Sequence, residues 1–352
     1  MTTSEPSGTG GRRAFRLRTS DIHGPGLTRV RHGRGFRYLD RSGRPVTDPA
    51  EKERLRRLVI PPAWRDVWIC PFPHGHIQAV GTDAAGRRQY LYHPVFRARQ
   101  EAAKHDHVLE TARSLPRLRD RVANDLAGRG LGRDRVLACA ARLLDLGFFR
   151  IGNDSYRRDH DTYGLTTLLR EHVECRRGEV CFSYPAKHSQ EVSRELVDEP
   201  AYRVVRSLKG RGGAEQRLFA YWEGRAWHPV YADDLNVYLR ERSGADLTAK
   251  DFRTWHATVL TAVALAVSSP VARESQAARR RAVNRAVREV ADYLGNTPAV
   301  CRASYINPRV TELFEAGRTI APALERLGAE VSFGRPATQG PVEEAVLRLL
   351  TR

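Results

Sequence analysis

Five side chains that could do chemistry stand among apolar or aromatic neighbours at widely separated positions of the chain: Arg150, Lys187, Arg253, Asn296 and Tyr305. The forked donors of an arginine fit two phosphate oxygens, and a positioned lysine can protonate an alkoxide as it departs. An asparagine amide can donate a hydrogen bond. A tyrosine hydroxyl becomes a useful nucleophile where nearby cations and donors take up phosphate charge. Together these residue types indicate phosphoryl transfer to a tyrosine.

Two of these residues also have an ordinary structural interpretation. Arg150 follows two phenylalanines in Gly147-Phe-Phe-Arg150-Ile-Gly, a poor setting for a solvated side chain. A salt bridge to a buried carboxylate such as Asp145 would account for it as well. Tyr305, in Ala303-Ser-Tyr305-Ile, could be an aromatic residue packed near a helix end.

The lysines are informative because only five of the 59 Lys and Arg residues are Lys. A position that keeps Lys in so Arg-rich a chain suggests a need for an ammonium group. Lys187 directly follows an expected β-hairpin, although a surface lysine is the ordinary interpretation and Lys209 is a rival downstream. Lys250 and Arg253 open an apolar helix, where free backbone N–H groups favour a phosphate; helix capping and pairing with Asp251 are the alternative.

The elements that must position these residues divide into a β-rich part and a helical part. Alternating and β-branched runs predict strands at 36–39, 67–69, 76–80 and 89–92. A turn is expected at 41–44 and a hairpin connection at 82–87. This first part therefore predicts a small antiparallel sheet.

After Pro94 the composition shifts to Ala, Arg, Glu and Leu, with helical spacing of apolar residues. Helices are expected at 96–112, 136–146, 233–240, 248–268, 271–294 and 341–352, with Gly147 and Gly295 as stop signals. One β-hairpin, with strands at 167–175 and 180–184, interrupts them. The fold class is therefore α+β: a small N-terminal antiparallel β-sheet domain, then a larger, mostly α-helical domain that contains a β-hairpin.

The composition gives the domain limits that we expect. Residues 1–20 are rich in Gly, Ser, Thr and Arg and predict a disordered basic tail. Residues 21–105 form the β-rich domain, residues 106–330 the helical domain, and residues 331–352 a C-terminal extension with a short helix.

The net charge of +18 and the pI near 10.3 make a polyanion, above all nucleic acid, the expected partner. The alternative is a soluble basic protein whose arginine bias reflects genomic base composition. The five cysteines are odd in number and form no C-x-x-C pair, so we expect reduced, intracellular thiols without a zinc site. No apolar run of membrane-span length and no secretory signal are visible, which predicts a cytoplasmic protein.

Several strings, in order along residues 35 to 310, together resemble the type IB DNA topoisomerases of poxviruses and bacteria. They are Ile60-Pro-Pro-Ala-Trp64, Gly75-His-Ile-Gln-Ala, Gly86-Arg-Arg-Gln-Tyr90-Leu-Tyr-His-Pro94, Phe149-Arg150-Ile-Gly, Tyr163-Gly-Leu-Thr-Thr, Phe252-Arg253-Thr-Trp and Ser304-Tyr305-Ile. The match in family order is far more specific than any one motif.

The resemblance assigns catalytic roles to Arg150, Lys187, Arg253, Asn296 and Tyr305. It also implies DNA contacts at Gln89, Tyr90, Tyr92 and Tyr156. Lys250 is added to these contacts because it lies at a helix start. For the first three of these contacts, an ordinary strand with Tyr90 and Tyr92 on one face is the alternative. Viral members use His where this chain has Asn296, although bacterial relatives have Asn. An amide cannot hold a proton, so Asn296 is expected only to donate a hydrogen bond.

The activity that the resemblance implies is relaxation of supercoiled duplex DNA through a 3′-phosphotyrosyl intermediate, without cofactor, ATP or metal. The β-rich domain would then be one half of a DNA clamp. We expect a nucleoid-associated monomer with no membrane partner and no obligatory protein partner. A tyrosine recombinase is the nearest alternative, but it usually has His-x-x-Arg where this chain has Lys250-Asp-Phe-Arg253. A nonenzymatic DNA-binding protein is the alternative from another class.

Overall fold

The computed structural model describes residues 16–186, 190–272, 275–327 and 339–351. The chain divides into two compact units, Met1–Lys104 and His105–Arg352. The first unit is built on an antiparallel sheet and the second is mostly helical with a smaller sheet region, which confirms the predicted α+β class.

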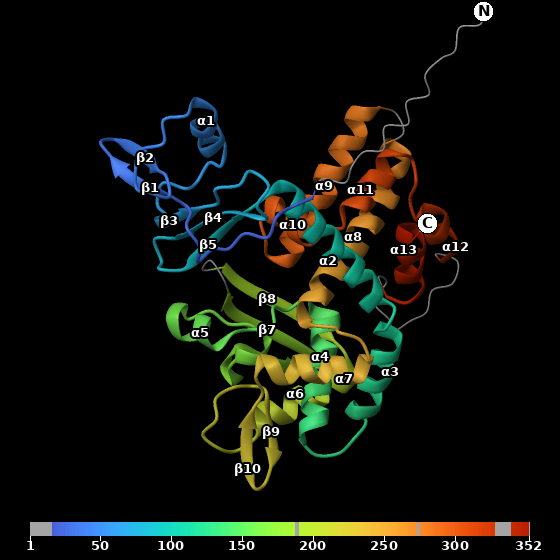
Figure 1. The fold of residues 1–352 in the computed structure, drawn as a ribbon. Helices are drawn as coiled ribbons and strands as arrows, with labels where there is room; N and C mark the ends of the chain where they lie inside the picture. The colour runs from blue at the N-terminus through green and yellow to red at the C-terminus, as the bar shows by residue number, and fades with distance from the viewer. Residues whose placement is uncertain (1–15, 187–189, 273–274, 328–338, 352) are drawn as a thin grey trace, which may run out of the picture. The chain divides into compact units, whose positions relative to one another are not determined.

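The first unit is a five-stranded antiparallel sheet in the order β2-β1-β3-β4-β5 (Figure 1). Its elements are β1 Leu27–His32, β2 Gly35–Leu39, α1 Pro49–Arg57, β3 Arg65–Ile69, β4 Ile77–Thr82 and β5 Arg88–Tyr92. The predicted strands and the hairpin joining the last two are confirmed. The sequence analysis did not predict β1 or α1. Strand β1 alternates apolar residues with arginine and threonine, and helix α1 is almost wholly polar in sequence.

Two of the resemblance strings have structural explanations in this unit. Arg29 is buried on β1, and its guanidinium donates to the carbonyls of Ile60, Pro61 and Trp64 at 2.8–2.9 Å. It thereby holds the Ile60–Trp64 segment in place, and burial lowers the pKa of Arg29. The buried amide of Gln78 donates in the same way to the carbonyl of Gly75 at 2.7 Å.

Residues 16–20 differ from the predicted disordered tail. Arg18 forms a parallel bridge with Gly75, and the Ser20 hydroxyl donates to the carbonyl of Ile77 at 2.8 Å. The end of the predicted tail is therefore docked on the first unit, while residues 1–15 lie outside the described residues.

The second unit is built from helices around one large hydrophobic core (Figure 1). The helices are α2 Pro94–Ala112, α3 Leu115–Leu126, α4 Arg133–Gly147, α5 Asp154–His160, α6 Glu199–Gly210, α7 Ala232–Ser243, α8 Ala249–Ala272, α9 Gln276–Leu294, α10 Pro298–Ser304, α11 Pro308–Glu315, α12 Ala321–Leu327 and α13 Pro341–Thr351. Helix α2 crosses the division between the units. The six predicted helices are present. The helix expected from residue 271 begins only at Gln276, because the Ser275 side chain caps it by accepting from the N–H of Ala278.

The predicted β-hairpin is present but differs in extent. Strands β6 Val173–Arg176, β7 Glu179–Ala186 and β8 Gln190–Val197 form a three-stranded antiparallel sheet. The first strand does not begin at Thr167, because residues 165–172 form two short 3-10 turns. A second hairpin, β9 Ala220–Glu223 with β10 Ala226–Pro229, was also missed.

Helix α13 was expected within a C-terminal extension, and the short helix is present. Its apolar residues Val342, Val346 and Leu350 are buried in the core of the second unit, so it is an integral part of that unit. In the part of the chain that the structure describes, no helix combines the length and hydrophobicity that a membrane span needs.

Candidate active site

The backbone before Arg150 takes an unusual conformation. Gly147 is the last residue of α4, and Phe148 takes the left-handed conformation at φ 57° that the sequence reading had reserved for a glycine. Gly147 must stay small for another reason, since a Cβ there would lie 2.3 Å from the ring of Phe149. The turn buries Phe148 and Phe149 and directs the chain into Arg150.

Arg150 is supported from both sides of its peptide. Its carbonyl accepts from the N–H of Leu165 at 2.8 Å. Gly164 packs so closely that a Cβ there would lie 2.5 Å from the nitrogen of Gly152 and 2.7 Å from the carbonyl oxygen of Arg150. The Tyr163-Gly-Leu-Thr-Thr string therefore fixes the backbone that carries this arginine.

The Arg150 guanidinium is directed to the end of helix α9. Nη2 donates at 2.8 Å both to the carbonyl of Gly295 and to Oδ1 of Asn296. Gly295 ends α9 in the left-handed conformation at φ 61°, as the sequence predicts. Arg150 and Asn296, 146 residues apart in sequence, are thus in direct contact.

Arg253 lies on the second turn of α8 and is almost completely buried, at 5% exposure. Its Nη1 donates to the carbonyl of Phe148 at 2.6 Å and its Nη2 to that of Leu294 at 2.9 Å. Each acceptor is at the C-terminal end of a helix, where carbonyls lack helical partners and favour a cation. Burial, and less strongly the nearby charge of Arg150, lower the pKa of Arg253, while Tyr305 partly offsets this shift.

Neither arginine has a carboxylate partner among the ion pairs of the described residues. The carboxylate proposed as the alternative partner of Arg150, Asp145, instead binds Arg119 at 2.7 Å and faces His256 at 3.3 Å. Because Arg150 and Arg253 are held by neutral oxygens, their charges are available to an anion.

In the side-chain amide of Asn296, the oxygen has a hydrogen-bond partner and the nitrogen has none. A guanidinium can only donate, so the oxygen of the amide must be the atom that accepts from Arg150. The Nδ2 donor is buried and has no hydrogen-bond partner. Nε of Arg253 is a second buried donor without a partner.

Tyr305 follows α10 directly, at its C-terminal end, and is half-buried. The centre of the Arg253 guanidinium lies 5.3 Å from the centroid of the Tyr305 ring. The Thr258 hydroxyl donates to the carbonyl of Thr254 at 2.8 Å, accepts from the N–H of Asn307 at 3.2 Å, and lies 3.3 Å from the carbonyl oxygen of Tyr305. The structure therefore brings Arg150, Arg253, Asn296 and Tyr305 together.

Sequence reasoning missed two residues beside this site. Thr258, one turn beyond Arg253 on α8, anchors the backbone just after Tyr305, because its hydroxyl accepts from the N–H of Asn307. Tyr184 on β7 packs at 6.3 Å from Phe149, and burial raises the pKa of Tyr184 to about 12, although the charges of Arg194, Arg150 and Arg253 oppose the shift. Only the position of Tyr184 on the strand before Lys187 could have suggested it.

The lysines and Tyr156 are not brought into these contacts. Lys187 lies outside the described residues, between β7 and β8. The rival Lys209 donates to the carbonyl of Val173, and among the described residues it makes no contact with the site. Lys250 is exposed on the first turn of α8, where Asp251 accepts from Thr248 and not from Lys250. Tyr156 lies on α5, and its side chain is outside the description.

The expected DNA contacts of the first unit lie on β5. Tyr90 and Tyr92 are exposed on one face of the strand, with their rings stacked at 6.1 Å. Gln89 is half-buried on the other face, and its amide donates to Asp83 at 2.9 Å. The two tyrosines are free to meet a ligand, whereas Gln89 would have to exchange its present acceptor.

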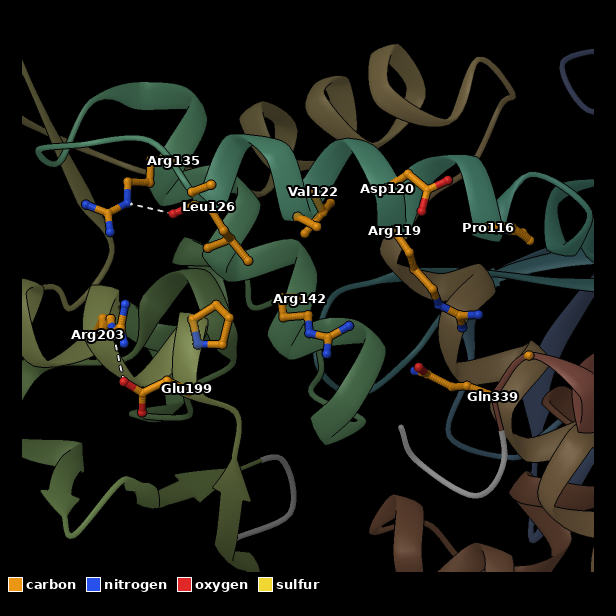
Figure 2. A pocket seen from close by; sticks show the side chains of 14 residues that line it. Pro116, Arg119, Asp120, Val122, Leu126, Arg135, Arg142, Glu199, Arg203 and Gln339 are labelled. Atoms are coloured by element: carbon orange, nitrogen blue, oxygen red, sulfur yellow. Dashed lines mark hydrogen bonds and ion pairs between the residues drawn. The ribbon is translucent and has the colours of Figure 1, made fainter. Parts of the chain in front are cut away.

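A pocket of the second unit is lined by other residues (Figure 2). Its lining includes Arg119, Arg142 and Arg203 from α3, α4 and α6, together with Leu126 and Gln339. None of Arg150, Arg253, Asn296 and Tyr305 lines it. The candidate active site is therefore distinct from this pocket.

A tyrosine close to two arginines and an amide, on a helical unit that follows a β-rich one, fits the resemblance to the type IB DNA topoisomerases. Residues 93–324, about two thirds of the chain, match the family described as "Eukaryotic DNA topoisomerase I, catalytic core", and the chain belongs to this family. Residues 35–83 match "Bacterial DNA topoisomerase IB, N-terminal domain". The protein is therefore an enzyme of the type IB class of DNA topoisomerases.

Individual relatives agree. The chain is 27% identical over 299 residues to the DNA topoisomerase 1B of Acanthamoeba polyphaga mimivirus, covering 82% of this chain and 88% of the relative. It is 23% identical over 239 residues to the DNA topoisomerase I of Monkeypox virus and to the DNA topoisomerase 1B of Vaccinia virus (strain Copenhagen), covering 66% of this chain and 71% of each relative.

Proposed function

We propose that the protein relaxes supercoiled duplex DNA by cutting one strand, with Tyr305 as the nucleophile that takes the scissile phosphate. The observation that carries this proposal is the set of unpaired donors around that tyrosine. Nδ2 of Asn296 and Nε of Arg253 are buried without partners, beside two arginines that are held only by neutral oxygens. A buried donor without an acceptor is costly, and an anionic phosphate supplies the missing acceptors.

In the proposed reaction the Tyr305 hydroxyl oxygen attacks the phosphorus, and the bond from phosphorus to the 5′ oxygen breaks. The phenolic proton is released to water, and the products are a 3′-phosphotyrosyl link and a free 5′-hydroxyl end. Arg150, Arg253 and Asn296 stabilise the negative charge of the pentacoordinate transition state. The free end turns about the intact strand, and the reverse reaction rejoins the DNA.

The departing 5′ oxygen needs a proton, and Lys187 is the proposed donor, assisted by Arg150. Asn296 cannot take this role, because an amide carries no titratable proton at ordinary pH. Lys187 follows the last residue of β7, Ala186, which is buried in the same core as Phe149.

The reaction exchanges one phosphodiester for another, so no net bond energy has to be supplied and ATP is not expected to be required. The arginines supply the positive charge that a divalent ion would otherwise provide, so we also propose that relaxation is metal-independent.

We further propose that both units contact the duplex as a clamp, and that the enzyme works as a monomer on nucleoid DNA. The contacts proposed for the first unit are Gln89, Tyr90 and Tyr92, and those for the second are Tyr156 and Lys250. The exposed tyrosine pair on β5 supports the first set, and the exposure of Lys250 at the start of α8 supports the second.

The test is relaxation of supercoiled plasmid in EDTA without nucleotide, with plasmids of either supercoil sign. Tyr305→Phe should bind DNA but leave no covalent adduct on a denaturing gel, whereas Tyr231→Phe, a change at an exposed tyrosine, should leave adduct formation intact. A requirement for ATP or Mg²⁺, or an adduct in the Tyr305→Phe variant, would overturn the proposal. Strand exchange between two duplexes would favour a recombinase, and binding without any adduct a nonenzymatic protein.

A further inference from the structure

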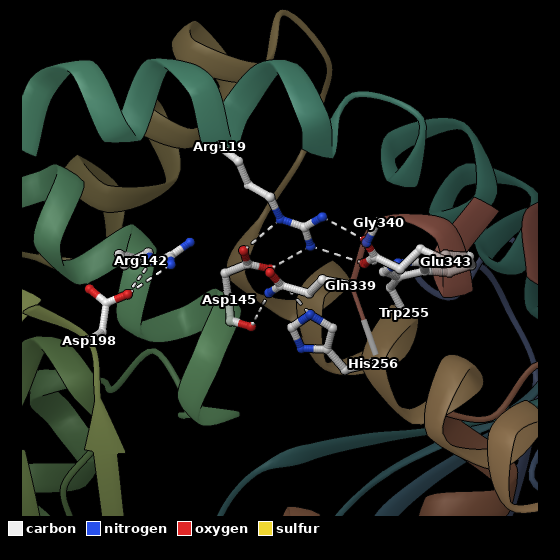
Figure 3. Close-up of polar contacts among 9 residues, drawn as sticks. All are labelled: Arg119, Arg142, Asp145, Asp198, Trp255, His256, Gln339, Gly340 and Glu343. Atoms are coloured by element: carbon white, nitrogen blue, oxygen red, sulfur yellow. Dashed lines mark hydrogen bonds and ion pairs between the residues drawn. The ribbon is translucent and has the colours of Figure 1, made fainter. Parts of the chain in front are cut away.

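A buried polar network joins helices α3, α4, α8 and α13 (Figure 3). At its centre, Arg119 binds two carboxylates. It donates to Asp145 at 2.7 and 2.9 Å and to Glu343 at 2.6 and 3.0 Å. All three side chains are largely buried, at 17%, 5% and 7% exposure respectively. Burial opposes a charge on Arg119, but the hydrogen bonds and charges of Asp145 and Glu343 outweigh it and raise the pKa of Arg119.

Glu343, on the first turn of α13, is bonded by three groups. Besides Arg119, it accepts from the indole N–H of Trp255 at 2.8 Å and from the backbone N–H of Gly340 at 2.9 Å. The preceding residue, Gln339, donates its side-chain amide to the carbonyl of Asp145 at 3.3 Å. The start of α13 is therefore fixed to α3, α4 and α8 at once.

The same network reaches the residues that hold the catalytic arginines. Trp255 and His256 follow Arg253 on α8 by two and three residues, and the His256 ring packs at 4.8 Å from the ring of Phe148. Phe148 in turn supplies the carbonyl that accepts from Arg253 at 2.6 Å. Asp145, which faces His256, lies in the last turn of α4, five residues before Arg150.

This part of the network is not covered by the family match, which ends at residue 324. Gln339, Gly340 and Glu343 all lie beyond that limit. The contacts from the C-terminal segment are thus a feature of this chain's own structure that the catalytic-core match does not predict.

We propose that Glu343 is a positioning residue for the active site: by binding Arg119 and Trp255 it fixes helix α8 and the end of α4, and so the placement of Arg253 and Arg150. The inference rests on the proposed function of those arginines. Removing the charge of Glu343 leaves the donors of Arg119 and the indole N–H of Trp255 without their full set of acceptors, in a region where unpaired groups are costly. The helices then relax to satisfy those donors, and a shift of about 1 Å at a catalytic group can cost about 100-fold in rate.

The experiment uses the full-length protein with Glu343→Gln, which keeps the shape of the side chain and removes its charge. Cleavage is measured in a single turnover on a duplex that traps the covalent adduct, and DNA affinity is measured separately. We expect the cleavage rate to fall by about 10-fold or more while the DNA dissociation constant stays within about 2-fold, because only the transition state uses the placement of the arginines. A phosphorothioate at a non-bridging oxygen of the scissile phosphate should then slow the variant less than the wild-type enzyme.

The matched control is Asp198→Asn. Asp198 is a buried carboxylate, at 8% exposure, bound by Arg142 of α4 at 2.7 Å, and Arg142 lies one turn before Asp145 (Figure 3). Loss of the Asp198 carboxylate should lower thermal stability without changing the cleavage rate of the folded enzyme. Trp255→Phe, which removes only the indole donor, should reduce the cleavage rate less than Glu343→Gln, and the two losses should not add.

A folded Glu343→Gln protein that cleaves at the wild-type rate would overturn the inference. An Asp198→Asn protein that loses as much of its cleavage rate as Glu343→Gln would also overturn it. If Glu343→Gln does not fold, Trp255→Phe decides: a lower cleavage rate with unchanged affinity supports the inference, and a wild-type rate overturns it. If the wild-type enzyme forms no adduct, the proposed function fails instead, and the two failures are thereby distinguished.

Discussion

At the scale of single residues, the site depends on arginines whose partners are neutral. A guanidinium can donate to two carbonyls in fixed directions and keep its charge for a third group, whereas an ammonium is a compact charge without that planar fork. Arg253 uses this property when it joins the carbonyls of Phe148 and Leu294. Lysine, although it preserves the charge, is therefore a poor substitute.

We expect Arg253→Lys to reduce the single-turnover cleavage rate by about 100-fold or more, the range found when one transition-state donor is lost. The DNA dissociation constant should change little, because a positive charge remains. Arg302→Lys is the control, since Arg302 is exposed and donates only to Asn284 in the described contacts. Equal rates for Arg253→Lys and the wild-type enzyme would show that the two-carbonyl arrangement is dispensable.

Gly164 allows a sharper test of backbone support. A methyl group there would meet the carbonyl oxygen of Arg150 at 2.7 Å, and backbone atoms cannot move aside as a flexible side chain can. Gly164→Ala should therefore displace Arg150 and slow cleavage by at least about 10-fold. Gly210→Ala, where no atom lies within 4 Å of the added carbon, should behave as wild type. Melting curves of both variants separate displacement from unfolding.

The types of the site residues were open to prediction from sequence, but their contacts were not. Arg150, Arg253, Asn296 and Tyr305, which the sequence singled out, lie together, and their catalytic roles are part of the proposed function. Apart from the side chain of Asn296, the partners of the arginines are backbone carbonyls of Phe148, Leu294 and Gly295, which carry no signature in the side-chain sequence. Glu343 contacts Arg119 across 224 positions, and no local pattern indicates so distant a pair.

At the scale of helices and strands, local patterns predicted about half of the elements and failed where tertiary contacts decide the outcome. The end of α4 is an example: Gly147 signals a stop, but the crowding of its α-carbon by Phe149 moves the left-handed residue to Phe148. The strand β8 was missed because its alternating polar residues resemble a loop. It becomes a strand by pairing with β7 along its whole length, from Gln190 to Val197.

The carboxylate that joins α3, α4 and α8 should make stability depend on pH. Burial alone would raise the pKa of Asp145, but the bonds from Arg119, followed by His256, outweigh burial and hold the pKa well below its ordinary value. Such a group contributes stability that is present above its unfolded pKa and is lost as pH falls through its folded pKa. We therefore expect the free energy of unfolding to fall as the pH drops below about 4.

Urea unfolding of the wild-type protein and Asp145→Asn at neutral pH and at about pH 3 measures this contribution. The variant should be less stable at neutral pH by about 3 kcal/mol, the cost of breaking a buried ion pair from one side. Its stability should then change less on acidification than that of the wild type. Equal acid sensitivity in the two proteins would assign the effect to other carboxyl groups.

At the scale of the whole molecule, composition alone identified the class of partner. A net charge of +18 spread over two units is the electrostatic basis for binding a polyanion such as duplex DNA. The arrangement of charges, in contrast, depends on which arginines are used internally. Arg29 and Arg253 are buried and held by neutral carbonyl oxygens, so the formal charge includes two charges that do not lie at the surface.

The proposed two-unit binding predicts a steep dependence on salt. With about six to ten phosphate contacts, the affinity of Tyr305→Phe for a duplex should fall by about 10³ to 10⁵ between about 50 and 200 mM salt. Fluorescence anisotropy with a labelled duplex measures the slope. A nearly flat dependence would contradict broad contact with the phosphate backbone and would leave only local binding at the site.

The unpaired donors of Asn296 and Arg253 have a thermodynamic consequence of their own. Each buried donor without an acceptor costs the empty enzyme about 1 to 3 kcal/mol of folding free energy. The arrangement of the site for a phosphate therefore lowers the free energy of unfolding. A ligand that supplies the missing acceptors raises it again. By linkage, an uncleavable duplex should raise the melting temperature of the protein, and the increase should shrink when these donors are removed.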